Sequence, residues 1–285
     1  MNCGIRAHDI QIVDNPDALV SRIEAMGFDY VQFAPKFSLA GLTDQGNNLN
    51  FGLANYTRQC FTDHDVSIAI LGCYSNIIHP DLKIRQQNLE RFIDYMSMAS
   101  TFGVPLVATE TGSVDDLFLP RAASYTPEAV DDVIEQVKYL VEQAEKIGCL
   151  VGIEPGVNHP IHDFATIQQL LDAIPSPNLK LIFDATNLVS SEKSDVVAIL
   201  RTGIQQFGRK IYAFHLKDYV YNDNHIQTVP VGDGVIDLAA ALQVIQELAP
   251  YSYQVWDEVS ATNFERSIRR IQELEHEADQ HLIRK

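Results

Sequence analysis

Four apolar runs in the second half of this sequence each end in a side chain that can bind a metal ion. They end at Glu154, Asp184, His215 and the adjacent pair Asp257-Glu258, and positions 154, 184, 215 and 258 are 30, 31 and 43 residues apart. These separations are close to the length of one strand-loop-helix-loop unit. If the runs are parallel strands of one barrel, the side chains meet at its C-terminal rim, where barrel enzymes place their catalytic groups. Three carboxylates gathered there would repel one another without a cation between them, so the pattern predicts a divalent-metal site.

The whole chain repeats the same alternation of strand and helix. Strands are expected at Cys3–Arg6, Asp29–Ala34, Ser67–Cys73, Pro105–Glu110, Cys149–Glu154, Lys180–Asp184, Lys210–Leu216 and Ser252–Glu258. Most are continuously apolar, as strands are when both faces of a parallel sheet are covered. Strict alternation predicts the α/β class, and eight repeats predict one closed (β/α)8 TIM barrel that forms a single domain over residues 1–285.

Helical periodicity fills the segments between these strands. The clearest helix has an apolar stripe from Val130 to Ala144 and follows Thr126-Pro127, a typical helix start. Further helices are expected at Asp17–Met26, within Leu53–His64, and at Leu82–Phe102, Phe164–Ile174, Ser194–Phe207, Leu238–Leu248 and Asn263–Ile283. Two long irregular stretches, Phe37–Gly52 and Ser113–Tyr125, follow the second and fourth strands, so they are expected to lie on the catalytic side and cover part of the site.

The composition bears on the compartment and the partners of the protein. The formal net charge is -17, from 38 acidic and 21 basic residues, which disfavours a nucleic-acid partner because the phosphate backbone demands a basic surface. No apolar run is long enough to span a membrane, and the N-terminus lacks the pattern of a signal peptide. The four cysteines have no CxxC spacing and are expected to be reduced thiols in the core. We therefore expect a cytoplasmic protein, and a homo-oligomer is compatible with the sequence.

Short motifs along nearly the whole chain resemble the xylose-isomerase-like TIM-barrel superfamily of sugar and sugar-phosphate isomerases and epimerases. The most specific motifs are Gly152-Ile153-Glu154-Pro155, Phe183-Asp184-Ala185-Thr186-Asn187-Leu188, His215-Leu216-Lys217-Asp218 and Gly232-Asp233-Gly234-Val235-Ile236-Asp237. Each motif is weak alone, but their order and spacing are fairly specific. The resemblance implies one divalent ion held by Glu154, Asp184, His215 and Glu258.

Two positions leave alternatives open. Asp257 and Glu258 are adjacent, and strand alternation turns only one of them inward; Glu258 is preferred for its reach and its place in the family, with Asp257 as the alternative. Epimerases of the group often have histidine where this chain has Asn187, which can hydrogen-bond a hydroxyl group but cannot titrate near neutral pH. Asn187 therefore bears on the identity of the substrate more than on metal binding.

The ligand set indicates both the ion and the reaction. Oxygen ligands with one imidazole favour manganese, with magnesium, cobalt or zinc as alternatives. Such an ion polarises a sugar carbonyl and stabilises the enediolate formed when the adjacent proton leaves, with Glu154 and Glu258 as the expected proton-transfer groups. The predicted function is a metal-dependent isomerase or epimerase of a small-molecule sugar or sugar phosphate. The alternatives are a dehydratase (lyase) of a cyclic polyol or keto-sugar, an endonuclease-IV-like phosphodiesterase, and a barrel that binds sugar without turnover.

Four other polar residues near strand ends are candidates for contacts with the substrate. His8 and Glu110 end the first and fourth strands, although an ordinary rim residue and a loop-capping acid are the alternative interpretations. Asn187 follows the sixth strand. Lys217 shares the strand face of His215 and can reach a hydroxyl or phosphate group; its alternative role is a salt bridge to a neighbouring acid such as Asp218.

Overall fold

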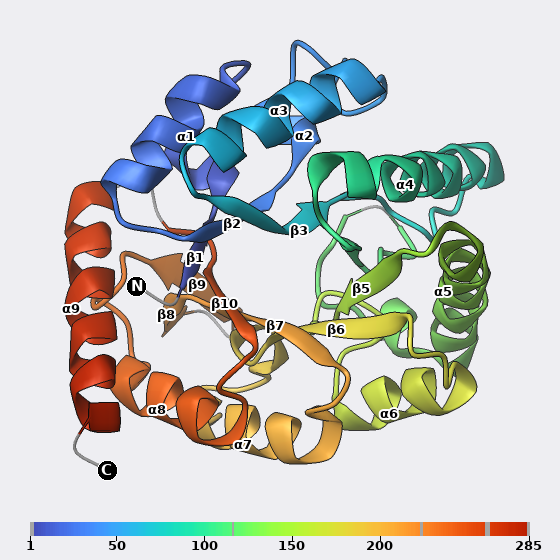
Figure 1. Ribbon diagram of the computed structural model, residues 1–285. Helices are drawn as coiled ribbons and strands as arrows, with labels where there is room; N and C mark the ends of the chain where they lie inside the picture. Colours follow the sequence, from blue (N-terminus) through green and yellow to red (C-terminus); the bar gives the residue numbers. More distant parts are fainter. Residues whose placement is uncertain (1–2, 116, 223–224, 260–262, 284–285) are drawn as a thin grey trace.

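Eight parallel strands close into a barrel in the computed structural model of the chain, so the predicted (β/α)8 TIM-barrel fold is confirmed (Figure 1). The structure describes residues 3–115, 117–222, 225–259 and 263–283. Around the barrel the strands follow the order β1, β10, β7, β6, β5, β4, β3, β2 and back to β1. Their bounds are β1 Gly4–Arg6, β2 Tyr30–Phe33, β3 Ser67–Gly72, β4 Leu106–Glu110, β5 Leu150–Glu154, β6 Leu179–Asp184, β7 Ile211–Leu216 and β10 Tyr253–Trp256.

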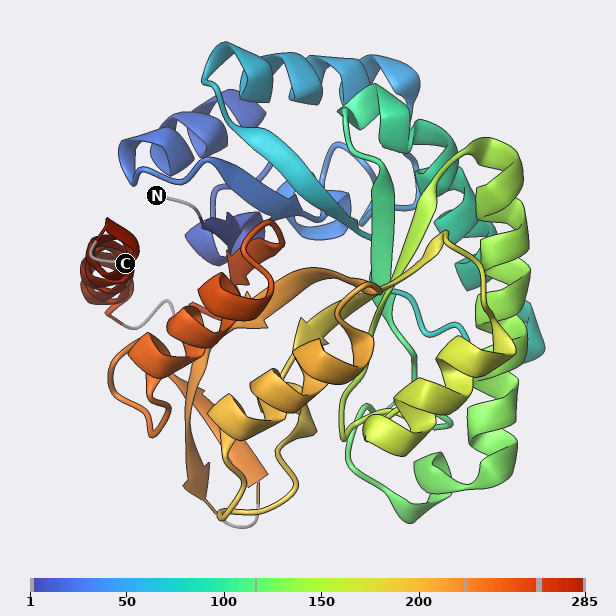
Figure 2. The ribbon, with the colours of Figure 1, turned by 60° about the horizontal axis from the view of Figure 1, so that its bottom comes forward.

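Helices surround the barrel on its outside, and each predicted helix is present within a few residues of its expected bounds (Figures 1 and 2). The bounds are α1 Pro16–Ala25, α3 Phe51–Asp63, α4 Leu82–Phe102, α5 Pro127–Ile147, α6 Phe164–Ala173, α7 Val196–Phe207, α8 Leu238–Leu248 and α9 Phe264–Ile283. The side chain of Thr126 caps α5 by accepting a hydrogen bond from the backbone N–H of Ala129. Gly148 ends the same helix with a φ of 81°, in the left-handed conformation that glycine adopts most readily.

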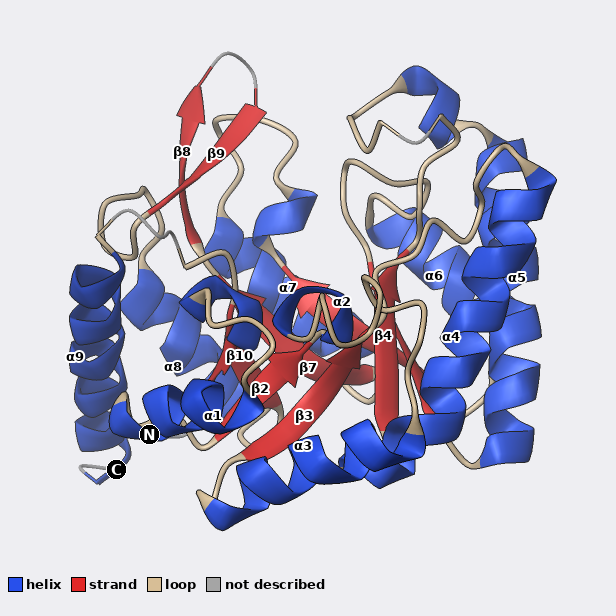
Figure 3. Cartoon of the chain, turned by 90° about the horizontal axis from the view of Figure 1, so that it is seen from above, coloured by secondary structure: helices blue, strands red, loops and turns tan. Residues whose placement is uncertain are grey.

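Several elements lie outside the predicted pattern, at the end of the barrel to which the strands point. A short helix α2 (Pro35–Ser38) follows β2, and an antiparallel hairpin of β8 (Asp218–Asn222) and β9 (His225–Val229) follows β7. Figure 3 shows this hairpin and the segment between β4 and α5 rising on either side of that end of the barrel. The last barrel strand also ends two residues earlier than expected, at Trp256.

Two separate layers of apolar side chains hold the barrel and its helices together. The barrel interior is filled by a small cluster of Tyr30, Ala69, Ile70, Leu106, Ala108, Ile182, Ala213 and Val255. A much larger cluster lies between the outer face of the strands and the helices, and it includes Phe33, Phe183, Phe214 and Trp256. Since side chains of a strand alternate between these two layers, the interior cluster identifies which residues of each strand point toward the barrel axis.

Two expectations from the composition can be compared with the structure. All four cysteines are buried and free of disulfide bonds, as expected for reduced core thiols. Among the described helices, none is long and apolar enough to cross a membrane.

We predict that Gly203→Ala destabilises the protein, although alanine favours helix more than glycine does. Gly203 is buried on α7 against the ring of Phe183, and a Cβ atom at position 203 would lie 2.2 Å from Cζ of that ring. Relieving such a contact in a packed core costs about 1–3 kcal/mol. Urea unfolding should show this loss of free energy of unfolding, while Thr202→Ala at the exposed neighbouring position should change it little. Equal stability of both variants would refute this packing of α7 on β6.

Candidate metal centre

Three acidic side chains and one histidine meet at the C-terminal end of the barrel strands. Among the residues that face the barrel interior are Ile182, Ala213 and Val255. Asp184, His215 and Asp257 come two positions later on the same strands, so they also point inward. Together with Glu154 at the end of β5 they form a buried group, in which one ligand atom from each residue lies within 4.8 Å of the others.

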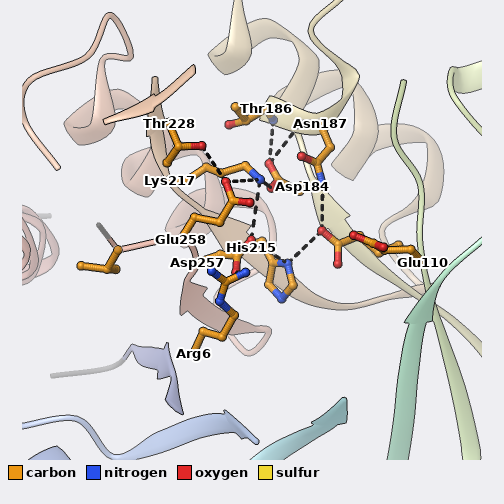
Figure 4. Close-up of polar contacts among 12 residues, drawn as sticks. Arg6, Glu110, Asp184, Thr186, Asn187, His215, Lys217, Thr228, Asp257 and Glu258 are labelled. Carbon is orange, nitrogen blue, oxygen red and sulfur yellow. Dashed lines mark hydrogen bonds and ion pairs between the residues drawn. The ribbon is translucent and has the colours of Figure 1, made fainter. Parts of the chain in front are cut away.

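Asp257, and not Glu258, lies in this group, so the structure favours the alternative prediction over the preferred one (Figure 4). Val255 faces the interior and Trp256 is fully buried in the outer core, so alternation turns Asp257 inward. Glu258 follows with a left-handed φ of 50°, which takes it out of the strand. Its Oε2 atom accepts a hydrogen bond of 2.6 Å from Thr228 in the hairpin, and 42% of its side chain is exposed.

The ring of His215 is held by a hydrogen bond on the side away from the carboxylates. Its Nε2 atom lies 2.7 Å from Oε1 of Gln32 in β2, and the amide nitrogen of Gln32 donates to Oη of Tyr74 at 2.6 Å. Because an amide oxygen only accepts, Nε2 carries the hydrogen, and in the neutral ring Nδ1 keeps its lone pair. Nδ1 lies 3.0 Å from Oε1 of Glu154 and 3.8 Å from Oδ2 of Asp257, so it is the atom that faces the acidic group.

Hydrogen bonds from one short segment orient two of the acids. Oδ1 of Asp184 accepts from the backbone N–H groups of Thr186 at 2.7 Å and Asn187 at 3.3 Å, in the 3-10 helix η3 (Thr186–Leu188) that follows β6. The side-chain amide of Asn187 donates to Oε1 of Glu154 at 2.8 Å. Asn187, which departs from the family pattern, therefore holds a carboxylate of the group.

Lys217 forms the salt bridge that was the alternative to a substrate contact, but with partners other than Asp218. Its buried Nζ atom lies close to three carboxylates: Asp184 Oδ2 at 3.0 Å, Glu258 Oε2 at 3.4 Å and Asp257 Oδ2 at 3.6 Å. Asp218 instead accepts hydrogen bonds from the backbone N–H groups of Gly232 and Gly234, and so holds the turn that leads into α8.

Cations around the group control its charge. Nη1 of Arg6, at the end of β1, lies 2.6 Å from Oδ1 of Asp257. Burial alone would raise the pKa of Asp257, but Arg6, His215 and Lys217 together hold it well below its usual range. Burial lowers the pKa of His215, but the carboxylates of Glu154 and Asp257 reverse this and raise it to about 9. Asp257 and the basic side chains of Arg6, His215 and Lys217 therefore stabilise one another's charged forms.

The donors of the group fit a divalent metal ion. Oδ2 of Asp184 and Oδ1 of Asp257 are buried acceptors without a hydrogen bond, although Lys217 and Arg6 lie within ion-pair distance of them. A carboxylate has about four lone-pair sites, so both side chains keep acceptor capacity for an ion beside these ion pairs. Carboxylate oxygens with one imidazole suit manganese, magnesium or similar ions, and the spacing of the four ligand atoms is compact enough for one ion.

A cavity of about 520 Å³ opens beside the group and has the size of a small-molecule site. Three of its lining residues connect it to the group: Arg6 contacts Asp257, Tyr74 is bonded to Gln32, and Glu110 is the register partner of Glu154. His8 and Glu110, both predicted to contact substrate, line this cavity. Phe37 and Phe118 line it too, so both long irregular stretches border this cavity.

His8 presents a neutral ring to the cavity. Its ring packs on Phe37 with centroids 4.7 Å apart, and the ring of Tyr74 lies edge-on at 5.9 Å. Burial, together with the positive charge of Arg6, lowers the pKa of His8 to about 3. At neutral pH this residue is therefore uncharged, and with its two neighbours it forms an aromatic wall.

Comparisons with known proteins agree with this fold. The model of a family described as xylose isomerase-like TIM barrel matches residues 20–277. The comparison with curated proteins gives no match.

Solved structures with very different sequences have the same architecture. A D-tagatose 3-epimerase-like protein aligns with a TM-score of 0.75 at 17% identity, over 99% of this chain and 100% of that one. The IOLI protein with a binding zinc atom aligns with a TM-score of 0.72 at 18% identity, over 98% of both chains. The probable 3-DHS dehydratase AsbF from Bacillus anthracis aligns with a TM-score of 0.69 at 14% identity, over 95% of this chain and 98% of that one. At such identities the likeness shows the fold alone.

Proposed function

Since the chain belongs to the xylose isomerase-like TIM-barrel family, we propose that it is a divalent-metal-dependent isomerase or epimerase of a sugar or sugar phosphate. The observation that carries the proposal is the buried group of three acids and one histidine beside a cavity of small-molecule size. The similarity to an epimerase-like protein over almost the whole of both chains supports the same class of reaction.

Glu154, Asp184, His215 and Asp257 are the proposed metal ligands. When bound, the ion polarises the substrate carbonyl and offsets the negative charge that develops as the neighbouring proton leaves. Manganese is the proposed ion, with magnesium, cobalt or zinc as alternatives; the zinc atom of the similar IOLI protein keeps zinc among them.

Glu154 is the proposed base that removes the proton next to the carbonyl. Burial raises the pKa of its carboxyl group, and His215 only partly opposes this effect. A raised pKa makes a carboxylate a better proton acceptor near neutral pH. Asn187 holds the carboxylate through Oε1. Glu258 keeps its proposed role as the second proton-transfer group, because its carboxylate lies at the edge of the same cluster, 3.4 Å from Nζ of Lys217.

A dehydratase is the second candidate function. Removal of a proton next to a carbonyl is also the first step when a β-hydroxyl group is lost as water, so the same base and the same ligands would serve. The similarity to the probable dehydratase AsbF supports this alternative. A phosphodiesterase gains no such support, because the group within the described chain is dominated by acids and has a single histidine.

Metal analysis combined with a substrate panel tests the proposal. The purified protein is dialysed against manganese, its bound metal is measured, and ketoses, aldoses and their phosphates are then offered with and without the ion. We expect one divalent ion for each chain and interconversion of at least one sugar pair that stops when the ion is removed. Protein that retains no metal, or that is equally active without it, would rule the proposal out.

We predict that Gln32→Leu weakens metal binding without removing a ligand. The substitution takes away the acceptor that places the hydrogen on Nε2 of His215, so Nδ1 is no longer fixed as the free nitrogen. Loss of such a supporting contact costs about 10- to 100-fold in metal affinity. Competition with a chromophoric chelator measures the effect. Gln32→Glu keeps an acceptor oxygen and should retain the affinity, and equal affinities of the two variants would show that the contact does not matter.

A further inference from the structure

Glu154, Asp184, His215 and Asp257 are called the metal group below. The cavity beside this metal group has a charge opposite to that of the whole protein. The chain carries 38 acidic and 21 basic residues. Of the charged residues that line the cavity, however, Arg6, Lys36 and Arg91 are basic and only Glu110 is acidic. The basic residues come from β1, α2 and α4, on the half of the barrel that lies across from β6 and β7 (Figure 1). A local excess of positive charge in so acidic a chain favours an anionic ligand at this cavity.

Among the described residues, none forms an ion pair with Lys36 or Arg91. Arg6 is paired with Asp9 at 2.8 Å and with Asp257 at 2.6 Å. Within the described chain, by contrast, neither Lys36 nor Arg91 makes a hydrogen bond or an ion pair, and the ammonium group of Lys36 lies only over the ring of Phe37, 5.5 Å from its centroid. Both residues are half-buried. Their charges are therefore partly removed from water and open to a ligand in the cavity.

The charges of Lys36 and Arg91 both affect the thiol of Cys73. Burial raises the pKa of the Cys73 thiol, at the end of β3, and the charges of Arg91 and Lys36 both oppose that rise. Lys36 and Arg91 also line the same cavity, so a ligand in that cavity meets both charges. Glu110, the acidic residue of the lining, is the register partner of Glu154 and so lies beside the metal group.

One wall of the cavity suits an uncharged carbon chain. It is formed by the packed rings of His8, Phe37 and Tyr74. Aromatic rings with a few polar groups are typical of the walls of small-molecule sites. The cavity therefore combines an apolar wall with two cations from α2 and α4, and it adjoins the metal group through Arg6 and Glu110.

On the basis of the proposed function, we propose that the substrate is a sugar with an anionic group, phosphate or carboxylate, at the end of its carbon chain remote from the carbonyl, and that Lys36 and Arg91 bind this group. Guanidinium and ammonium groups are the usual protein partners of both anions. The anion would set the direction in which the sugar lies, so that its carbonyl end reaches Glu154 and the other metal ligands.

Three ketoses that differ only at carbon 6 test the proposal: D-fructose, D-fructose 6-phosphate and D-fructuronate. Their affinities for the manganese-loaded protein are measured by isothermal titration calorimetry. Because each charge-assisted contact is strong, we expect at least one of the charged sugars to bind about 10- to 100-fold more tightly than fructose. The comparison of phosphate with carboxylate identifies which anion the site takes. If neither charged sugar binds more tightly than fructose, including the case in which none of the three binds, the proposal is overturned.

Substitutions show whether the two cations are responsible. Lys36→Gln and Arg91→Gln should each lower the affinity for the preferred charged sugar about 10-fold or more and leave that for fructose unchanged. Arg91→Lys keeps the charge and should retain most of the preference. Lys138→Gln, on the exposed face of α5, changes the net charge equally and should have no effect. Equal losses for all three sugars in the Lys36 and Arg91 variants would assign these residues a structural role and contradict the proposal.

The same titration in metal-free protein separates this inference from the proposed reaction. The anion site does not include the metal ligands, so metal-free protein should still prefer the charged sugar. A preference for the charged sugar in a protein that never binds metal would support the anion site and rule out the proposed reaction. A metal-dependent isomerase that shows no preference for the charged sugar would support the proposed reaction and rule out the anion site.

Discussion

Asp257→Asn should lower metal affinity by about 100-fold or more, whereas Glu258→Gln should leave it nearly unchanged. The first substitution removes one of three carboxylate charges from a group whose ligand atoms lie within 4.8 Å of one another. Glu258 stands outside the group and bonds to Thr228. Elemental analysis after dialysis against a limiting concentration of manganese measures the difference between the two variants.

Folding of the Asp257 variant has to be checked separately, because Arg6 loses a charged partner. Arg6 keeps its bond to Asp9, so we expect a native circular dichroism spectrum and a modest fall in melting temperature. If folded Asp257→Asn keeps its metal while Glu258→Gln loses it, the preferred sequence prediction was right and the ligand set drawn from the structure is wrong.

Glu154→Gln should lower turnover about 10²- to 10⁴-fold at saturating manganese while changing substrate affinity little. The amide keeps the shape and one oxygen donor of the side chain but cannot accept a proton. Asn187 has no titratable group and cannot replace it. Steady-state kinetics at several manganese concentrations separate the loss of the base from a loss of the metal.

Glu110→Gln is the matched control for this variant. Glu110 lies beside Glu154 in the sheet and lines the cavity, so its substitution removes the same charge from a neighbouring position. We expect it to raise KM more than it lowers kcat, since Glu110 is outside the metal group. A Glu154→Gln enzyme with nearly full turnover would mean that another residue removes the proton.

The fold was predictable from the sequence because its signals are local. Apolar runs and helical periods alternate through the whole chain, and the ends of helices such as α5 carry ordinary capping residues at Thr126 and Gly148. Three of the four members of the metal group were identified because each ends an apolar strand. The hairpin β8–β9 was missed because it interrupts the repeat inside what resembled a single loop.

The sequence contains a local signal that favours Asp257 over Glu258. A large aromatic side chain such as Trp256 fits the outer core between strand and helix better than the narrow barrel interior. This places Val255 and Asp257 on the inward face, as the structure has them. Family position and side-chain length outweighed this local signal and led to Glu258 in place of Asp257, the residue that the structure places in the group.

The supporting residues could not be predicted, since their contacts depend on closure of the barrel. Gln32 and His215 are 183 positions apart, and Arg6 reaches Asp257 only because β1 pairs with β10. No periodicity or short motif marks such pairs. Lys36 and Arg91 likewise share a cavity only after α2 and α4 have packed on the barrel.

The central claim is that the protein moves a proton next to a sugar carbonyl, and solvent hydrogen exchange tests it most directly. The manganese-loaded protein is incubated in deuterated water with the sugar that it converts, and nuclear magnetic resonance follows the hydrogen at the carbon next to the carbonyl. We expect deuterium to enter at that carbon, or the original hydrogen to move to the adjacent carbon, and both to stop in Glu154→Gln. Product that forms with neither exchange nor transfer of that hydrogen would contradict the account.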